Sequence, residues 1–160
     1  LVIERPAELR GDLISTNRIF AHDLGLLDAD LFLQTHATNP LLKSETIAKA
    51  LRLFLEHEAD NYDSLFSVNA HHSRFYDGNG QAINHDPDNL IRTQDLPPLY
   101  EENSCIYVFT RDSFARHGRR IGAKPYMMPI NRIEATDIDD AFTFRLAELL
   151  SLYASAEGNA

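Results

Sequence analysis

The sequence predicts an α/β fold with a largely parallel sheet, and three observations carry that prediction. Short apolar segments alternate along the chain with longer segments of helical periodicity. The run at residues 31–33 is continuously apolar, which is typical of a strand covered on both faces. The length of 160 residues suits one domain with a core of its own.

Five short apolar segments predict the strands. They are residues 1–4, which Arg5 and Pro6 close, and residues 31–33, 65–68, 105–109 and 124–130. Ligands of open α/β sheets bind beyond the carboxyl ends of the strands. We therefore expect the chemistry in the polar segments that follow residues 33 and 68.

Four segments predict helices: residues 12–27, residues 44–54, residues 111–117 and residues 139–153. Asp12 and Ser44 suit the first two N-caps, and Gly118 suits the end of the third helix. The first and last helices each place four large apolar residues on one face: Leu13, Phe20, Leu24 and Leu27, and Phe142, Leu146, Leu149 and Tyr153.

Composition excludes several classes of protein. A single cysteine, Cys105, excludes a disulfide framework and a cysteine-rich metal site. No apolar run approaches the ~18 residues of a transmembrane helix, and no signal peptide is recognisable, so we expect a cytoplasmic protein with no membrane partner. The net charge of −9 argues against broad nucleic-acid binding, although it leaves room for a single nucleotide.

The strongest chemical candidate is the acidic run that precedes the last helix. If residues 137–139 are extended, Asp137 and Asp139 point to the same side, and two carboxylates suit Mg²⁺. The alternative is that these residues only form an acidic helix start, which the helix dipole favours.

Residues 71–103 are rich in Gly, Pro, Asn, Asp and His and have no strong periodicity, which is typical of a functional segment. Within it, Arg92 suits a carboxylate or phosphate, or is a solvated loop cation. His71, His72, His85 and Asp86 match no zinc pattern, and Gly78-Asn79-Gly80 predicts a hairpin turn.

Three segments together resemble the N-acylneuraminate cytidylyltransferase family, which makes CMP-sialic acids and relatives. RPAEL at residues 5–9 is similar to the family's R-P-x-E-L. RTQDLP at 92–97, followed by NSCIY at 103–107, resembles R-x-Q-x-L-P and N-G-x-I-Y. DID at 137–139, with AE at 147–148, resembles the family's metal-binding signature.

The resemblance implies a Rossmann-like nucleotidyltransferase domain over residues 1–160, with residues 71–103 as a dimerisation insertion. The insertion reaches into the partner's active site in that family. The resemblance therefore implies a homodimer in which Arg92 serves the neighbouring subunit.

The reaction implied is Mg²⁺-dependent transfer of CMP from CTP to the anomeric hydroxyl of a sugar acid, with release of pyrophosphate. Asp137 and Asp139 would hold the metal, and Arg92 would bind the sugar carboxylate. Arg5, Ser15 and Thr16 would contact the nucleotide. The sugar pocket would be lined by Gln34, His36, Gln94, Asn103 and Tyr107.

Two departures from the family pattern qualify this picture. The family opens with a strand and a Gly/Lys/Arg-rich phosphate loop that nothing in this sequence matches, which predicts either a truncated enzyme or a non-catalytic remnant that binds or scaffolds. The family's L-Q-P-T-S-P-L-R is LQTHATNPLL at residues 33–42, so a gapless match puts His36 at the glutamine position and Leu42 at the arginine position.

Overall fold

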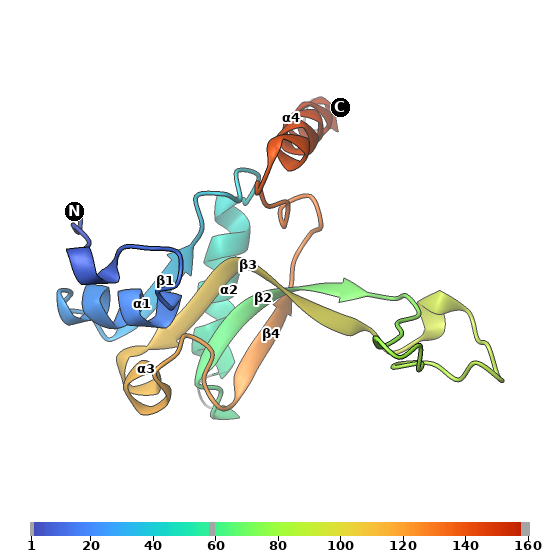
Figure 1. Ribbon diagram of the computed structural model, residues 1–160, viewed down its shortest axis with the longest axis horizontal. Helices are drawn as coiled ribbons and strands as arrows, with labels where there is room; N and C mark the ends of the chain where they lie inside the picture. The colour runs from blue at the N-terminus through green and yellow to red at the C-terminus, as the bar shows by residue number, and fades with distance from the viewer. Residues whose placement is uncertain (1, 58–59, 158–160) are drawn as a thin grey trace.

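A four-stranded mixed sheet forms the centre of the computed structural model, which describes residues 2–57 and 60–157 (Figure 1). The order is β1-β3-β2-β4, formed by β1 (Leu31–Thr35), β2 (Ser64–His71), β3 (Leu99–Thr110) and β4 (Pro125–Pro129). β3 pairs antiparallel with β1 and β2, whereas β2 and β4 pair in parallel. Three strands therefore run in one direction, and β3 alone opposes them.

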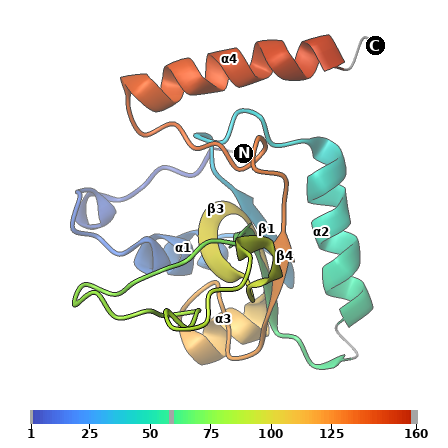
Figure 2. The same cartoon turned by 90° about the vertical axis from the view of Figure 1, so that its right-hand side faces the viewer.

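Helices cover both faces of this sheet. α2 (Ser44–His57) lies on one side, and α1 (Thr16–Gly25) and α3 (Arg111–His117) lie on the other (Figure 2). Ala50 and Phe54 of α2 pack in a cluster with Ile106 and Val108 of β3. The alternate β3 residues, Tyr107 and Phe109, pack with Leu24 of α1 and Phe114 of α3. This three-layer arrangement confirms the predicted α/β, Rossmann-like class.

Two predictions near the amino terminus are wrong. Residues 2–4 form no strand, and Val2 is 93% exposed, because no strand of the described chain lies beside them to pair with; Leu1 lies outside the described residues. The first helix begins at Thr16, because the chain turns at Gly11–Ile14 before it. Leu13 is consequently fully exposed, and Ser15, not Asp12, occupies the N-cap.

The other predicted elements are confirmed. α2 spans Ser44–His57, so Ser44 is its first helical residue and not the predicted N-cap. α3 spans Arg111–His117 and ends at Gly118, whose φ of 65° lies in the left-handed region that glycine adopts most readily. The strand predicted at residues 105–109 is the inner half of the longer β3. Short 3-10 turns, η1 (Ala7–Leu9) and η3 (Thr93–Asp95), complete the pattern.

Residues 72–98 form an arm that projects from the sheet between β2 and β3 (Figure 1). The outer halves of these two strands pair as its base, with Val68 opposite Glu102 and His71 opposite Leu99. The predicted turn at Gly78–Gly80 lies in the arm, closed by a hydrogen bond from Asp77 N to Gln81 O of 2.8 Å. The arm exposes four large apolar side chains: Tyr76, Ile83, Leu90 and Ile91.

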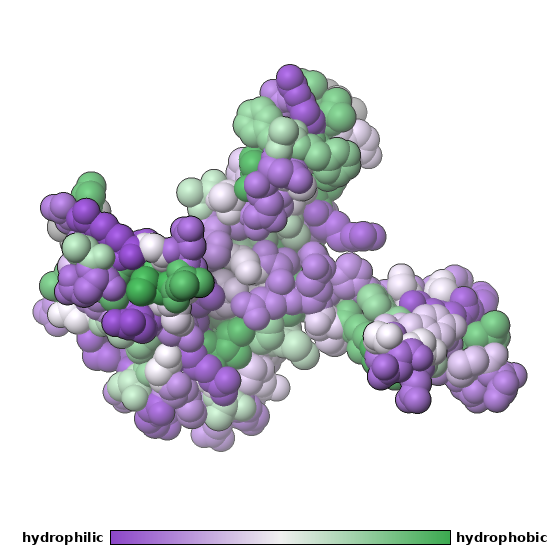
Figure 3. All heavy atoms as spheres, viewed as in Figure 1, coloured by the Kyte–Doolittle hydropathy of each residue, from purple (hydrophilic) through white to green (hydrophobic). Residues whose placement is uncertain are grey.

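α4 (Ala141–Glu157) forms as a helix, but its predicted core-facing side is not buried. Phe142, Leu146, Leu149 and Tyr153 are 40–75% exposed, and Ala147 is the one residue of the helix below 9% exposure in the part that the structure describes. The helix stands off the sheet, linked to it by residues 130–140, so apolar side chains lie on the surface there (Figure 3). No described helix is both long enough and apolar enough to cross a membrane.

A wide bulge divides β3 into two halves. Phe66 pairs with Tyr107 and Val68 pairs with Glu102, so only Ser67 faces residues 103–106. The Ser67 hydroxyl fills the gap by donating to Asn103 Oδ1 (2.6 Å) and accepting from Ile106 N (2.9 Å). Ser104 within the bulge has φ = 59°, a left-handed backbone conformation that interrupts the regular strand locally.

We predict that Ser67→Ala lowers the free energy of unfolding by about 1–3 kcal/mol, because it leaves the buried Ile106 N–H without an acceptor. Urea denaturation measures the effect as a lower midpoint at unchanged slope. Ser73→Ala on the exposed arm is the control. Equal midpoints for both variants would show that the hydroxyl does not hold the bulge.

Candidate functional site

Four side chains meet on the α1 face of the sheet, at the carboxyl end of β1. Gln34 and His36 follow Phe32 at intervals of two residues, so they share its face, and Tyr107 of β3 is the register partner of Gln34. The rings of His36 and Tyr107 lie 6.3 Å apart. The structure therefore brings together three of the residues that the resemblance assigns to a sugar pocket, and it adds a fourth, Arg120.

Tyr107 is completely buried and oriented by its neighbours. Its hydroxyl donates to the Glu102 carboxylate, and Ser104 Oγ lies 3.3 Å away. Burial, together with the bond to Glu102, raises the pKa of Tyr107 to about 12. The phenol therefore stays protonated at physiological pH and holds Glu102 at the entrance to the site.

Arg120 lies across Tyr107 from the loop between α3 and β4. Its guanidinium carbon is 3.9 Å from the centre of the Tyr107 ring and 5.0 Å from that of Phe20, and its Nη1 donates to Gln34 Oε1 at 2.6 Å. Stacking and the hydrogen bond together fix the guanidinium plane.

His36 is neutral in this setting. Burial and the positive charge of Arg120 lower the pKa of His36 from its ordinary 6.5, and the carboxylates of Asp137 and Glu102 oppose this only in part. A neutral imidazole offers one donor and one acceptor, which suits the hydroxyl groups of a sugar.

A cavity of about 260 Å³ opens beside these residues. Its lining comes from the start of α1, the β3 bulge and the α3–β4 loop: Asn17, Glu102, Arg119, Arg120 and Ile121. Two cations, one carboxylate and one amide therefore face a small space, a set that suits an anionic, hydroxylated ligand.

The α3–β4 loop that carries Arg119 and Arg120 is anchored by Asp63. The Asp63 carboxylate accepts hydrogen bonds from Ala123 N (2.7 Å), Lys124 N (3.1 Å) and the Ser64 hydroxyl (3.1 Å). Burial opposes ionisation of Asp63, but these bonds outweigh it and lower its pKa below 3.8. A side chain at Gly122 would collide with the same carboxylate, so only glycine allows this close approach.

Asn103 has a structural partner for its amide. Its Oδ1 accepts from Ser67, and its Nδ2 donates to Asn69 Oδ1 at 3.1 Å. Asn69 Nδ2 in turn donates to the Glu101 carboxylate, which also lies 2.7 Å from His71 Nε2. The hydrogen bonds from His71 and Asn69 lower the pKa of Glu101. Asn103 therefore links the bulge to the base of the arm.

In the acidic run before α4, Asp140 caps the helix, whereas the side chains of Asp137 and Asp139 take no part in the cap. Asp140 caps the helix: its Oδ1 accepts from Thr143 N (2.8 Å), while Thr143 Oγ1 accepts from Asp140 N (3.0 Å). This reciprocal cap satisfies the helix start without Asp137 or Asp139. The segment is tied to the loop after β1 by the bond from Ile138 N to Thr38 O of 2.9 Å, and the chain bends at residues 139–140.

Asp137 lies beside Asn39, whose side-chain amide oxygen is buried without a hydrogen-bond donor. Asn39 is 5% exposed and donates through Nδ2 to Asp137 Oδ1 at 3.4 Å, whereas its Oδ1 has no hydrogen-bond partner. A buried amide oxygen without a donor, next to a carboxylate, fits a hard cation such as Mg²⁺. Asp139 lies two residues further on and is exposed.

The other predicted site residues lie elsewhere. Arg5 is exposed, and its carbonyl accepts from Arg10 Nε. Ser15 and Thr16 start α1, next to Asn17 of the 260 Å³ cavity. Arg92 and Gln94 are exposed on the arm, so a single chain does not bring them to Tyr107, and Arg92 makes two bonds to Asp95, of 2.7 and 3.1 Å.

The histidines of the arm and of its base make separate contacts: His71 of β2 with Glu101, His72 with the Leu96 carbonyl, and His85 with the Tyr76 hydroxyl. Among the described residues, no three His, Cys, Asp or Glu side chains converge on a metal position.

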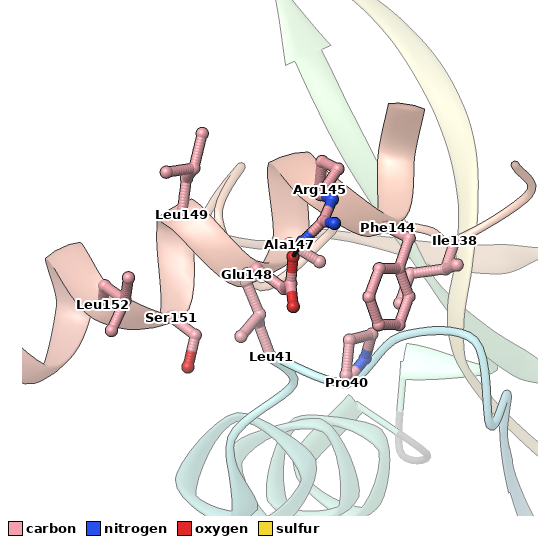
Figure 4. A pocket seen from close by; sticks show the side chains of 10 residues that line it. All are labelled: Pro40, Leu41, Ile138, Phe144, Arg145, Ala147, Glu148, Leu149, Ser151 and Leu152. Atoms are coloured by element: carbon pink, nitrogen blue, oxygen red, sulfur yellow. Dashed lines mark hydrogen bonds and ion pairs between the residues drawn. The ribbon is translucent and has the colours of Figure 1, made fainter. Parts of the chain in front are cut away.

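A larger groove of about 650 Å³ lies between α4 and the loop that follows β1 (Figure 4). Pro40 and Leu41 form one wall, and Phe144, Leu149 and Leu152 form the apolar part of the other. Arg145 and Glu148 pair with each other at 2.6 Å. The groove is mainly apolar, its one carboxylate is paired with Arg145, and Tyr107 is not among the residues that line it.

Sequence reasoning missed Arg120, Glu102 and Asn17. The pair Arg119-Arg120 directly after the helix-ending Gly118 is the one visible signal, since two adjacent cations follow an element boundary there. Nothing local in the sequence shows that this loop folds back over Tyr107.

The polar cavity of this three-layer α/β domain lies at strand ends, where open α/β sheets bind their ligands. Comparison with known proteins makes this specific: residues 2–152 match the cytidylyltransferase family, and the chain belongs to it.

The chain is similar to N-acylneuraminate cytidylyltransferase from Streptococcus agalactiae serotype V, with 30% identity over 81% of this chain and 33% of that protein. The serotype III protein of the same name is 29% identical over the same shares. Post-translational flagellin modification protein B of Campylobacter coli is 25% identical over 76% of this chain and 52% of its own length. The chain thus spans between one third and about half of these relatives.

We predict that Asp63→Asn lowers stability at pH 7 and that this difference disappears in acid. The native pKa of Asp63 lies below that of the unfolded chain, so its stabilisation is complete above about pH 4 and is lost as pH falls through the native pKa. Thermal unfolding of both proteins from pH 7 to pH 3 measures this. A difference in melting temperature that stays constant with pH would contradict the role of the Asp63 charge.

Proposed function

We propose that the protein transfers CMP from CTP to the anomeric hydroxyl of a sialic-acid-like or other 3-deoxy-ulosonic acid. The observation that carries the proposal is the convergence of Gln34, neutral His36 and Tyr107 beside Asp137, in a chain of the cytidylyltransferase family. The names of the relatives support a sugar-acid acceptor.

In the proposed reaction the anomeric oxygen attacks the α-phosphorus of CTP. A new P–O bond forms, the bond between the α- and β-phosphates breaks, pyrophosphate leaves, and the hydroxyl proton passes to water. Such a step depends on positioning and charge neutralisation. The groups on the α1 face would orient the sugar, and Arg5, Ser15 and Thr16 are proposed to contact the nucleotide.

Asp137 and Asp139 would hold Mg²⁺, with Asn39 Oδ1 beside them. A bound Mg²⁺ supplies polarisation of the α-phosphate and acidifies the attacking hydroxyl. The division of labour at this segment supports the assignment, because Asp140 alone caps α4.

The second candidate is a non-catalytic binding or scaffold protein of the same fold. The exposed apolar side chains of the arm and of α4 favour it, since surfaces of this kind mark protein interfaces. Turnover of CTP separates the two candidates.

We further propose a homodimer formed through the arm. Leu90 and Ile91 are 61% and 44% exposed on a segment that projects from the sheet. An arm that crosses to a second subunit would cover these side chains and bring Arg92 and Gln94 towards that subunit's site.

We predict that Asp139→Asn in the full-length protein lowers Mg²⁺-dependent pyrophosphate release at least about 100-fold, because it removes a charged metal ligand, and leaves the melting temperature within about 2 °C, since Asp139 is exposed. A coupled pyrophosphate assay with CTP measures the rate. Asp28→Asn, which is exposed and remote from α4, is the matched control. Unchanged turnover in Asp139→Asn would overturn the metal assignment.

We also predict that Leu90→Asp shifts the protein from dimer to monomer at micromolar concentration, because a buried carboxylate without a partner is costly at an interface. Light scattering after size exclusion gives the mass. Leu55→Asp, on the exposed side of α2, should leave the dimer intact. A wild-type monomer would refute the dimer.

A further inference from the structure

We propose that Arg120 is the residue that binds the carboxylate of the sugar acid, and that it acts within its own chain. This inference rests on the proposed function and names the group that reads the acid end of the substrate. The resemblance instead assigns the carboxylate to Arg92. Three observations on the structure favour Arg120.

The guanidinium of Arg120 has donors to spare. Gln34 Oε1 takes one N–H of Nη1, and the ring of Tyr107 covers one face of the group. Within the described chain, no carboxylate oxygen lies within 4.0 Å of it. Arginine has five N–H donors in a planar fork, so the remaining edge is available to an anion.

The unpaired edge belongs to a residue that lines a cavity. The space of about 260 Å³ is smaller than the roughly 300–1,000 Å³ of sites that enclose a whole ligand. It therefore suits one end of a sugar acid. Arg119 adds a second positive charge to the lining, while Glu102 and Asn17 offer acceptors to hydroxyl groups.

The orientation of Arg120 is fixed before any ligand binds. The stack on Tyr107, the contact with Phe20 and the bond to Gln34 come from three different elements, and Asp63 anchors the loop beneath. A preorganised fork loses little side-chain entropy when it binds. Arg92 also keeps free N–H donors, but it is exposed, and its guanidinium is paired with Asp95, three residues further along the same arm.

The test compares a carboxylate with its ester. Calorimetry on the full-length protein, with Mg²⁺ and α,β-methylene-CTP to prevent turnover, measures binding of N-acetylneuraminate and of 3-deoxy-manno-octulosonate, each beside its methyl ester. We expect the wild type to prefer the acid by about 10- to 100-fold, the value of a charge-assisted bidentate contact.

Arg120→Met keeps the apolar contact with Tyr107 and should reduce this preference at least about tenfold. Arg120→Lys keeps the charge without the fork and should give an intermediate ratio, which guards against a folding defect in the first variant. Arg92→Met should keep the wild-type ratio. Arg52→Met, exposed on α2, is the control for loss of a surface arginine.

The inference is overturned if Arg120→Met keeps the wild-type ratio or if Arg92→Met alone removes it. In those cases the acid still binds, and the proposed function stands. If the wild type binds neither acid and releases no pyrophosphate from CTP with either, the proposed function and this inference both fall.

Discussion

The arrangement of the site depends on the two hydrogen bonds that the Ser67 hydroxyl makes to Asn103 and Ile106 across the β3 bulge. The hydroxyl lets β2 stay straight while β3 makes a four-residue detour, because one side chain satisfies both Asn103 and Ile106. The part of β3 that precedes the bulge pairs with β2 at the base of the arm. The part that leads into α3 lies in the core. The same bulge brings Glu102 within reach of the Tyr107 hydroxyl, so one irregularity sets both the arm and the cavity.

The site is polar yet rigid because its main charged groups are held by partners in the surrounding chain. Tyr107 orients Glu102, Gln34 and Tyr107 orient Arg120, and Asp63 fixes the loop that carries Arg120. Burial and Arg120 keep His36 neutral. A ligand would therefore meet groups that are already placed, which is the condition under which binding energy serves positioning.

Local pattern predicted what local forces decide. The α3 stop at Gly118 and the turn at Gly78–Gly80 follow from capping and turn chemistry, and both are confirmed. The predicted α2 start is correct to within one residue, although Ser44 is the first helical residue and not the N-cap. Leu13 and the apolar face of α4 were misjudged, because periodicity says which residues share a face but not whether anything covers it. Arg120 escaped notice because its role depends on a loop returning over β3, a long-range contact that no spacing encodes. Gln34, His36 and Tyr107 were expected in one pocket only because of the resemblance; the strand register that places Gln34 opposite Tyr107 is known from the structure.

The central claim is that this site joins CMP to a sugar acid, and detection of the joined product tests it most directly. The full-length protein is incubated with CTP, Mg²⁺ and each of several eight- and nine-carbon 3-deoxy-ulosonic acids, and the products are separated and weighed by mass spectrometry. The account predicts a CMP-linked sugar acid, with one equivalent of pyrophosphate, for at least one acid. Absence of that product with every acid, together with no thermal shift on adding CTP, would contradict it and favour the non-catalytic alternative.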